Sequence, residues 1–200
     1  MAEAPPVRRG RGRRPAAEVR AGVLSAAGRI LMDDGLGAVT FDRVAAEAGS
    51  SKMTLYKWWP SPGALAAEAY FARSEQVLEF PDTGDLRADL TAQVSAFVGM
   101  LVQGGAGRPV AELIGAAQTD PVLAAAWSQH YTRPRRELAR ARLRTAQEQG
   151  QLRPEVDLDV VIDLLWGACY KRLLVPDNEF DASYAATLVD HALFGVVPRD

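Results

Sequence analysis

The chain has 200 residues and a formal net charge of −2, and its hydrophobic fraction of 48% is enough for a buried core. Cys169 is the single cysteine, so the sequence excludes an intrachain disulfide and fits a reducing compartment. No apolar run reaches the roughly 18 residues of a membrane helix, and no apolar segment of a signal peptide follows the basic N-terminus. We therefore expect a cytoplasmic protein without a membrane span.

Charge is divided unevenly along the chain. Residues 1–60 carry ten Lys and Arg against six Asp and Glu, a net charge of +4, whereas residues 61–200 carry thirteen against nineteen, a net charge of −6. A basic front on an acidic body is typical of a protein in which one small part contacts nucleic-acid phosphates. The arm RRGRGRR, Arg8 to Arg14, predicts either a segment that enters a DNA minor groove or a solvated tail.

Two helices are predicted directly after this arm. Apolar residues recur at helical spacing from Val19 to Ile30 and predict a first helix over residues 16–34. Thr40 is a suitable N-cap for a second helix, and Gly49 permits the positive φ of the sharp turn that ends it.

A third predicted helix, residues 51–58, has one apolar edge and one polar edge. Leu55 and Trp59 are expected to point inward, whereas the residues available on the outer edge are Lys52, Met53, Thr54 and Lys57. A short helix, a glycine turn and a helix with a polar outer edge form a helix-turn-helix, which lays its second helix in the DNA major groove. An internal helical hairpin with a solvated face is the alternative.

The remaining sequence predicts helices and no strand. The expected segments cover residues 62–78, 86–103, 109–118, 121–149, 158–175 and 183–196. The predicted fold is all-α with about nine helices. Its parts are a flexible basic arm over residues 1–15, an N-terminal three-helix helix-turn-helix DNA-binding domain over residues 16–62, and a C-terminal helical ligand-binding and dimerisation domain over residues 63–200.

The segment over residues 158–175 is apolar on nearly every side. A helix with this pattern is buried on both sides, so one side would meet its own core and the other a second subunit. Together with the last helix, it predicts a four-helix homodimer interface. The candidate interface residues are Val161, Leu164, Leu165, Ala168, Leu188 and Leu193. A helix fully internal to one domain is the alternative.

Large or polarisable side chains of the middle helices predict an apolar small-molecule pocket. The candidates are Phe97, Met100, Leu101, Leu113, Trp127, His130, Tyr131, Trp166 and Tyr170, with plain core packing as the alternative for each. A solvated face is the default expectation for the arginines between Arg133 and Arg144. An anionic-ligand site or ion pairs with acidic residues of the last helices, and a second DNA-binding patch, are the alternatives.

No pattern of an enzyme or a metal site is found in the sequence. GGAG, residues 104–107, lacks the spacing and the lysine of a phosphate-binding loop. His130, His191 and Cys169 are spaced too widely for a metal site, and the apolar helix around Cys169 favours inert packing over redox sensing. We expect no enzymatic activity, no metal and no cofactor, although sequence alone leaves a Cys169–His pair open.

The segment from Thr40 to Leu65 follows the pattern T…VA..AG.S…LY..W.S…L. The matching residues are Thr40, Phe41, Val44, Ala45, Ala48, Gly49, Ser51, Lys52, Met53, Thr54, Leu55, Tyr56, Trp58, Trp59, Pro60, Ser61 and Leu65. Over residues 16–65 the chain resembles the tetracycline-repressor (TetR) family of bacterial transcriptional regulators. This resemblance implies a homodimer that reads a palindromic operator and releases it when its C-terminal domain binds a small molecule.

The resemblance also assigns residues to DNA. It implies that Ser51, Lys52, Met53 and Thr54 face the major groove, that Thr40 and Tyr56 contact phosphate, that Arg43 reaches a base or phosphate, and that Lys57 and Trp58 flank the backbone. One position departs from the family pattern, because Pro62 stands where a phosphate-binding lysine is usual. Loss of one such contact reduces the steepness of log K against log salt concentration by about one unit.

These observations favour a ligand-responsive homodimeric repressor. The expected partners are double-stranded operator DNA, a small-molecule effector and a second copy of the chain, with no membrane partner. A ligand-independent DNA-binding protein and a helical small-molecule-binding protein without DNA binding are the alternatives.

Overall fold

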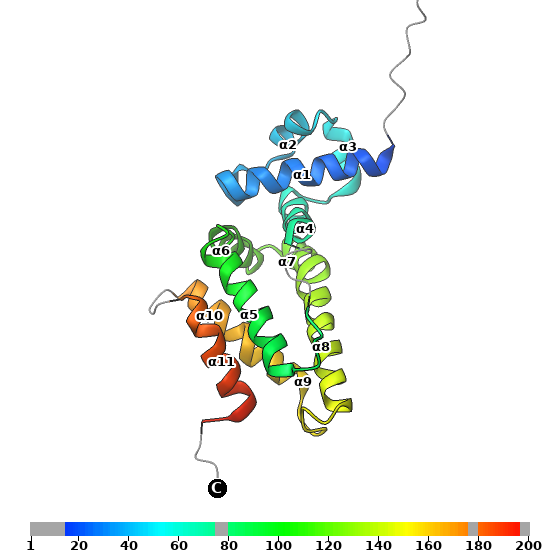
Figure 1. Ribbon diagram of the computed structural model, residues 1–200. Coiled ribbons are helices and arrows are strands. Elements are labelled where there is room, and N and C mark those ends of the chain that lie inside the picture. The colour runs from blue at the N-terminus through cyan, green and yellow to red at the C-terminus, as the bar shows by residue number, and fades with distance from the viewer. Residues whose placement is uncertain (1–14, 75–79, 176–179, 197–200) are drawn as a thin grey trace, which may run out of the picture.

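The computed structural model describes residues 15–74, 80–175 and 180–196, and every regular element within these ranges is helical. The all-α prediction is confirmed. When the helices are joined across two π-helical segments, the described residues form nine helices and one short 3₁₀ turn. Figure 1 shows a small N-terminal group of helices above a larger C-terminal body. Within the described ranges, no helix is both long and apolar enough for a bilayer span.

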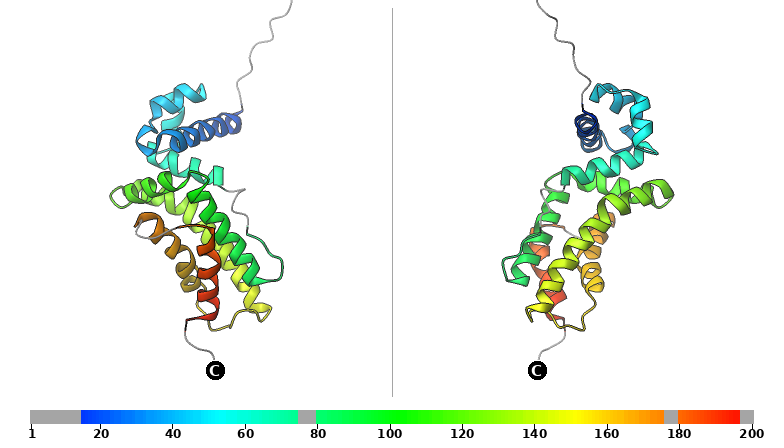
Figure 2. Two further views of the ribbon diagram at one scale, coloured as in Figure 1. Left: turned by 60° about the vertical axis from the view of Figure 1, so that its left-hand side comes forward. Right: turned by 90° about the vertical axis from the view of Figure 1, so that its right-hand side faces the viewer.

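The N-terminal group contains the predicted helix-turn-helix. Its elements are α1 (Ala16–Asp34), η1 (Leu36–Ala38), α2 (Phe41–Ala48) and α3 (Lys52–Trp58). The chain then enters α4 (Pro62–Ser74), which packs against α1 on one side and the body on the other. Figure 2 shows α4 between the two groups in both views. Residues 75–78 of the helix predicted over 62–78, and the basic arm, lie outside the described residues.

The C-terminal body is a bundle of longer helices. Its elements are α5 (Leu86–Val102), α6 (Gly107–Ala117), α7 (Pro121–Trp127), η2 (Ser128–Thr132), α8 (Arg133–Glu148), α9 (Leu158–Ile162), η3 (Asp163–Gly167), α10 (Ala168–Leu174) and α11 (Ala182–Phe194). The segments η2 and η3 are π-helical, so each of the uniform helices predicted over residues 121–149 and 158–175 is interrupted by one π-segment.

Short polar side chains begin most of these helices. A side-chain oxygen accepts a backbone N–H in the first turn of α2, α3, α5, α7, α9 and α11, and the capping residues are Thr40, Ser51, Asp85, Asp120, Asp157 and Asp181. Such caps satisfy N–H groups that have no partner inside the helix. At the end of α2, Gly49 has the left-handed conformation expected for the turn, with φ of 59°.

A buried ion pair fastens α8 to α5. Arg142 donates from Nε and Nη2 to Asp89 Oδ2 at 2.9 and 2.7 Å, and the Thr83 hydroxyl donates to Asp89 Oδ1 at 2.6 Å. Burial opposes ionisation of Asp89, but the hydrogen bonds from Thr83 and Arg142 outweigh it and hold the pKa of this carboxyl below its ordinary value. The charged pair therefore stabilises the bundle near neutral pH.

We expect Asp89→Asn to lower the free energy of unfolding by about 3–5 kcal/mol, because it removes the buried counter-charge of Arg142 and leaves only the exposed carboxylate of Asp82, 3.3 Å from its Nε. Urea denaturation at pH 7 measures this loss. Since the pKa of Asp89 is lowered in the folded state, the difference from the wild type should shrink as the pH falls through the folded pKa.

The matched control for this change is Asp190→Asn, which breaks an exposed pair between Arg87 on α5 and Asp190 on α11. Exposed pairs contribute little to stability, so unfolding should hardly change. Equal losses for the two variants would show that the buried pair has no special role.

Candidate nucleic-acid interface and effector cavity

The helix-turn-helix begins both of its helices with hydroxyl caps. The Thr40 hydroxyl accepts the Arg43 N–H at 3.2 Å, and the Ser51 hydroxyl accepts the Thr54 N–H at 3.2 Å. The hydroxyls of Ser51 and Thr54 also lie 2.9 Å apart and share a hydrogen bond. Three of the predicted DNA contacts are therefore held by the local fold of α2 and α3.

The outer edge of α3 presents a mixed surface to solvent. Met53 is 76% exposed and Tyr56 is 62% exposed, which is unusual for side chains of this size. The Tyr56 ring packs edge-on against Phe41 of α2, with 4.7 Å between ring centroids, so its orientation is fixed. Lys57 is exposed as predicted, whereas Trp58 is half-buried against Trp59.

Two cations of this surface already have acidic partners. Lys52 on α3 forms an ion pair with Asp42 on α2, and Arg43 forms one with Asp34 at the end of α1. All four side chains are largely exposed. The sequence indicated the cations but not these partners, because a helix-turn-helix brings α2 and α3 together only in three dimensions.

The first junction between the helix-turn-helix and the body is centred on Glu68 of α4, which is 8% exposed. Trp59 Nε1 donates to its Oε2 at 2.7 Å, and Arg20 Nη2 of α1 donates to the same oxygen at 2.8 Å. The Arg20 guanidinium also lies over the Trp59 ring, 5.1 Å from its centroid. One carboxylate thus ties α1 and the end of α3 to α4.

A second junction joins the turn after α1 to α6. The Leu36 N–H donates to Glu112 Oε2 at 2.6 Å, Arg108 Nε donates to Glu112 Oε1 at 2.8 Å, and Arg108 Nη2 donates to the Asp34 carbonyl at 3.2 Å. The Leu36 N–H, followed by the Arg108 guanidinium, holds the pKa of Glu112 below its ordinary value. Gly35 lies under this clasp with φ of 87° and ψ of 176°.

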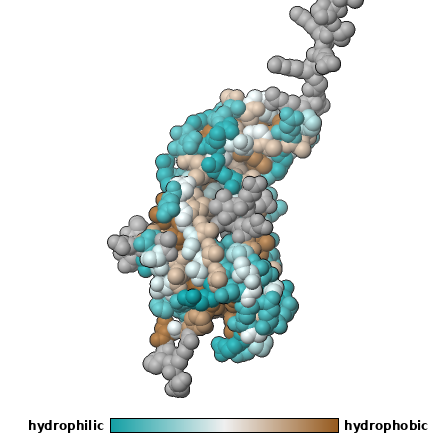
Figure 3. All heavy atoms as spheres, viewed as in Figure 1, coloured by the Kyte–Doolittle hydropathy of each residue, from teal (hydrophilic) through white to brown (hydrophobic). Residues whose placement is uncertain are grey.

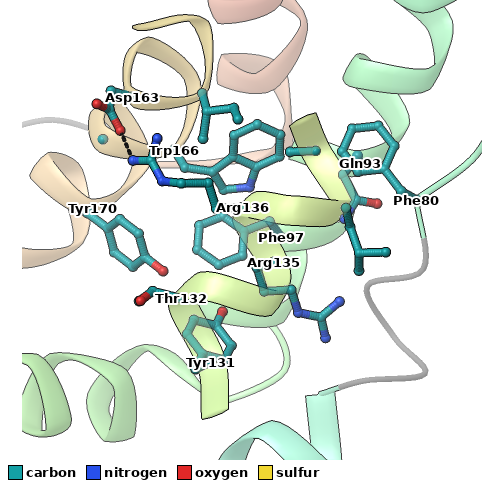
Figure 4. Close-up of a pocket in the computed structure, with 14 residues that line it drawn as sticks. Phe80, Gln93, Phe97, Tyr131, Thr132, Arg135, Arg136, Asp163, Trp166 and Tyr170 are labelled. Carbon is teal, nitrogen blue, oxygen red and sulfur yellow. Dashed lines mark hydrogen bonds and ion pairs between the residues drawn. The ribbon is translucent and has the colours of Figure 1, made fainter. Parts of the chain in front are cut away.

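The body contains a cavity of about 260 Å³ among α5, η2, α8 and η3. Of the predicted pocket residues, Phe97, Tyr131, Trp166 and Tyr170 line it, as Figure 4 shows. The other lining residues are Phe80, Gln93, Thr132, Arg135, Arg136, Leu138, Ala139, Ile162, Asp163 and Gly167. Arg135 and Arg136 belong to the arginine run singled out in the sequence, whereas Gln93, Thr132 and Asp163 were missed because no sequence pattern shows which polar side chains face inward.

The remaining pocket candidates lie elsewhere. Leu101 and Leu113 are core residues, and Trp127 stacks behind Tyr131 with 4.4 Å between ring centroids. Met100 lines a separate cavity of about 210 Å³ beside α4, and His130 faces a groove next to Trp58 and Trp59. These five residues do not line the cavity of about 260 Å³, and their part in ligand binding stays a prediction.

The arginines of α8 are engaged by acidic side chains. Arg136 Nη1 donates to Asp159 Oδ1 at 2.7 Å and Arg136 also pairs with Asp163, while Arg140 Nη2 donates to Asp159 Oδ2 at 2.7 Å. For Arg136 and Arg140 the structure thus shows the alternative of ion pairs with acidic residues of the last helices in place of the expected solvated face. Cys169 is fully buried, and burial raises the pKa of its thiol to about 12, which favours packing over redox chemistry.

Comparison with known proteins identifies the family. The family model described as the tetracyclin repressor-like C-terminal domain matches residues 80–192, and the model of bacterial regulatory proteins of the tetR family matches residues 23–69. The chain belongs to the TetR family of transcriptional regulators. Helix α3 is thus the second helix of a TetR-type helix-turn-helix. The cavity lies in the C-terminal domain of such a regulator.

Three relatives support this assignment. The chain is 36% identical to the uncharacterized HTH-type transcriptional regulator YdeS of Bacillus subtilis (strain 168), over 87% of each chain. It is 30% identical to the DNA-binding transcriptional repressor TetR of Mycobacteroides abscessus (strain ATCC 19977), over 88% of this chain and 93% of the relative. The crystal structure of the TetR family transcription regulator SCO0332 is 54% identical, with a TM-score of 0.85, and covers 90% of this chain and 100% of that one.

The predicted interface residues do not all reach the surface of this TetR-family protein. Leu165 is fully buried in the core of its own protomer, which corrects the prediction for this residue. Val161 is 6% exposed but lines the same groove as Leu164, which is 53% exposed, and Ala168, Leu188 and Leu193 are half-buried. Val160 and Phe194 are further exposed apolar residues of this groove, and the sequence pattern missed Val160. Figure 3 shows hydrophobic residues at the surface near the end of α11.

We expect Gly35→Ala to lower the free energy of unfolding by about 1–3 kcal/mol, because its φ and ψ lie in a region that is open essentially only to glycine. A Cβ there would also lie 2.5 Å from the Arg108 guanidinium and 2.7 Å from the Glu112 carboxylate, which displaces the clasp on α6. Denaturant unfolding measures the loss. Gly37→Ala is the control, since a Cβ at Gly37 meets nothing within 4 Å, and a similar loss there would contradict the explanation.

Proposed function

We propose that this TetR-family regulator is a homodimeric repressor that binds a palindromic operator and leaves it when a small molecule enters the cavity of the body. The observation that carries the proposal is the exposed edge of α3, where the large side chains of Met53 and Tyr56 are 76% and 62% exposed. The 30% identical relative from Mycobacteroides abscessus is named a repressor, which supports repression over activation.

The proposed operator contacts follow from the chemistry of α2 and α3. Lys52 can donate to a guanine or a phosphate, and Met53 can only make apolar contact, for example with a thymine methyl group. Ser51, Thr54 and Arg43 lie at the edges of the same surface, and hydroxyl groups at Thr40 and Tyr56 can donate to phosphates. Lys57 and Trp58 would flank the backbone.

A homodimer is supported by the exposed apolar side chains of α9, η3 and α11. Val160 and Leu164 are 54% and 53% exposed, and Phe194 is 46% exposed. All three line one groove of the body together with Leu193. Pairing of two such surfaces about a two-fold axis would bury them in an isologous interface and set the two α3 helices at a fixed separation.

The route from cavity to operator that we propose runs along α4. Tyr131 of the cavity wall lies 5.1 Å from Tyr70 of α4 between ring centroids, and Trp127 lies 5.6 Å from the same Tyr70. Two residues earlier on α4, Glu68 holds Trp59 and Arg20 of the DNA-binding part. An effector that displaces Tyr131 would therefore shift α4, and with it the spacing of the two α3 helices.

Operator binding is tested by fluorescence anisotropy on duplex DNA from the region upstream of the protein's own gene. We expect Lys52→Ala to weaken binding by about 1–3 kcal/mol, unequally across operator variants if Lys52 reads a base. Asp42→Asn should tighten binding several-fold, because it releases Lys52 and removes a negative charge from the DNA-facing surface.

Two controls make the anisotropy experiment specific. Asp33→Asn changes the net charge equally at another exposed site near the end of α1. The double variant Asp42→Asn, Lys52→Ala should lose the gain of the single change. If Asp33→Asn tightened DNA binding as much as Asp42→Asn, the pairing of Asp42 with Lys52 would play no part in affinity. If Lys52→Ala had no effect on binding, α3 would not be the helix that reads the operator.

The proposed interface is tested by Leu164→Asp. We expect this variant to sediment as a monomer, because dimerisation would bury an unpaired carboxylate. Val122→Asp is the matched control on α7, since Val122 is 45% exposed and lies away from the groove. Unchanged dimer mass for Leu164→Asp, measured by analytical ultracentrifugation, would rule out this packing.

A further inference from the structure

The wall of the cavity is unusually rich in fixed aromatic rings. Phe97 and Tyr170 meet edge-on at 5.5 Å between centroids, Phe80 and Trp166 meet at 6.2 Å, and Tyr131 is held from behind by the stacked ring of Trp127. Rings that brace one another in this way keep flat surfaces at fixed angles. The cavity is therefore preformed for a flat, apolar ligand.

Both π-helical segments within the described ranges open onto this one cavity. Tyr131 and Thr132 of η2 line one side, and Asp163, Trp166 and Gly167 of η3 line another. A π-segment breaks the regular hydrogen bonding of its helix and is frequently found at functional sites. Two of them meeting at one cavity indicate a built binding site rather than a packing defect.

The polar groups inside the cavity converge at one end. In Figure 4 the hydroxyls of Tyr131 and Tyr170 turn toward the middle of the pocket beside Thr132. Burial raises the pKa of both phenols, that of Tyr170 well above its ordinary value, so both stay protonated, and the two hydroxyls are hydrogen-bonded to each other. A ligand oxygen at this end would join this uncharged hydroxyl pair as a further hydrogen-bond partner.

The charged groups near the cavity are directed to other partners. The guanidinium of Arg136 is held by Asp159 at 2.7 Å and by Asp163. Arg135 keeps its charge, but it donates from Nη2 to the Ser74 carbonyl at 2.6 Å, lies over the Phe71 ring, 5.7 Å from its centroid, and is turned away from the tyrosine hydroxyls in Figure 4. A negatively charged ligand group at those hydroxyls would thus be buried beside uncharged groups, which is unfavourable.

We propose that the cavity binds a compact, uncharged aromatic compound of one or two rings that carries a hydroxyl or carbonyl oxygen. Its ring would lie between the aromatic walls, with its oxygen at the hydroxyls of Tyr131 and Tyr170. The volume of about 260 Å³ is slightly below the roughly 300–1,000 Å³ of sites for drug-sized ligands, which fits this size. The ligand class follows from the cavity alone. Only the statement that this compound is the effector rests on the proposed function.

Isothermal titration calorimetry of the full-length protein tests the ligand class with four probes. 2-Naphthol has the proposed chemistry, 2-naphthoate adds a negative charge, 1-octanol replaces the rings by a flexible chain, and naphthalene lacks the oxygen. We expect 2-naphthol to bind at least tenfold more tightly than 2-naphthoate and 1-octanol. Tighter binding of 2-naphthoate or 1-octanol, or no binding of 2-naphthol, would overturn the proposal.

Substitutions locate the site. Tyr170→Phe removes one hydroxyl and keeps the ring, so it should weaken 2-naphthol about tenfold and leave naphthalene binding unchanged. Tyr184→Phe is the matched control, because Tyr184 lies on α11 and does not line the cavity. Equal effects of the two changes on 2-naphthol, or an equal loss of naphthalene binding in Tyr170→Phe, would overturn the assignment. Thermal melting shows whether both variants are folded.

A second readout separates this inference from the proposed function. Operator anisotropy is measured for wild type and Tyr170→Phe with increasing 2-naphthol. If Tyr170→Phe needs a higher 2-naphthol concentration than wild type to release the operator, both the ligand class and the effector role are supported. If 2-naphthol binds with the expected dependence on Tyr170 but the operator stays bound, the ligand class stands and the effector role fails. Operator release by 2-naphthoate or 1-octanol, without binding of 2-naphthol, overturns the ligand class and leaves the regulator intact.

Discussion

The structure depends on α4, because this one helix belongs to both parts of the molecule. Its buried Glu68 accepts hydrogen bonds from Trp59 and Arg20, so the DNA-binding part is fixed to it by a carboxylate with little solvent around it. One half-turn later, Tyr70 packs into the aromatic group of the body. Hydrogen bonds on one side and ring contacts on the other make α4 rigid, and a rigid connector transmits displacement rather than absorbing it.

The clasp between α6 and the turn after α1 adds a second constraint. Glu112 and Arg108 hold the backbone around Gly35 by two hydrogen bonds and are joined to each other by a third, so the DNA-binding part is attached at two separated places. Two attachments limit rotation about α4 alone. A displacement of α4 or of α6 would therefore reach the DNA-binding part through one of these attachments.

The DNA-facing surface is balanced rather than strongly basic. Asp42 and Asp34 pair with Lys52 and Arg43 within the described part of the chain, so in the proposed operator complex phosphates would compete with carboxylates for these cations. Such competition weakens nonspecific attraction, which is mainly electrostatic, more than it weakens contacts that read a base. The arrangement favours discrimination between operator and other DNA over raw affinity.

The sequence by itself determined the helical fold, the helix-turn-helix and its capping residues, because apolar spacing, Thr40, Ser51 and Gly49 act through neighbours within a few residues. It also indicated four aromatic residues of the cavity, since large side chains on middle helices are rarely exposed. Only the tertiary structure decided which residues of the π-segments meet. Leu165 of η3 faces the core, whereas Asp163 and Trp166 of η3 and Tyr131 and Thr132 of η2 line the cavity. The pairing of Asp42 with Lys52 and of Glu68 with Trp59 likewise depends on helices that meet only in the folded chain.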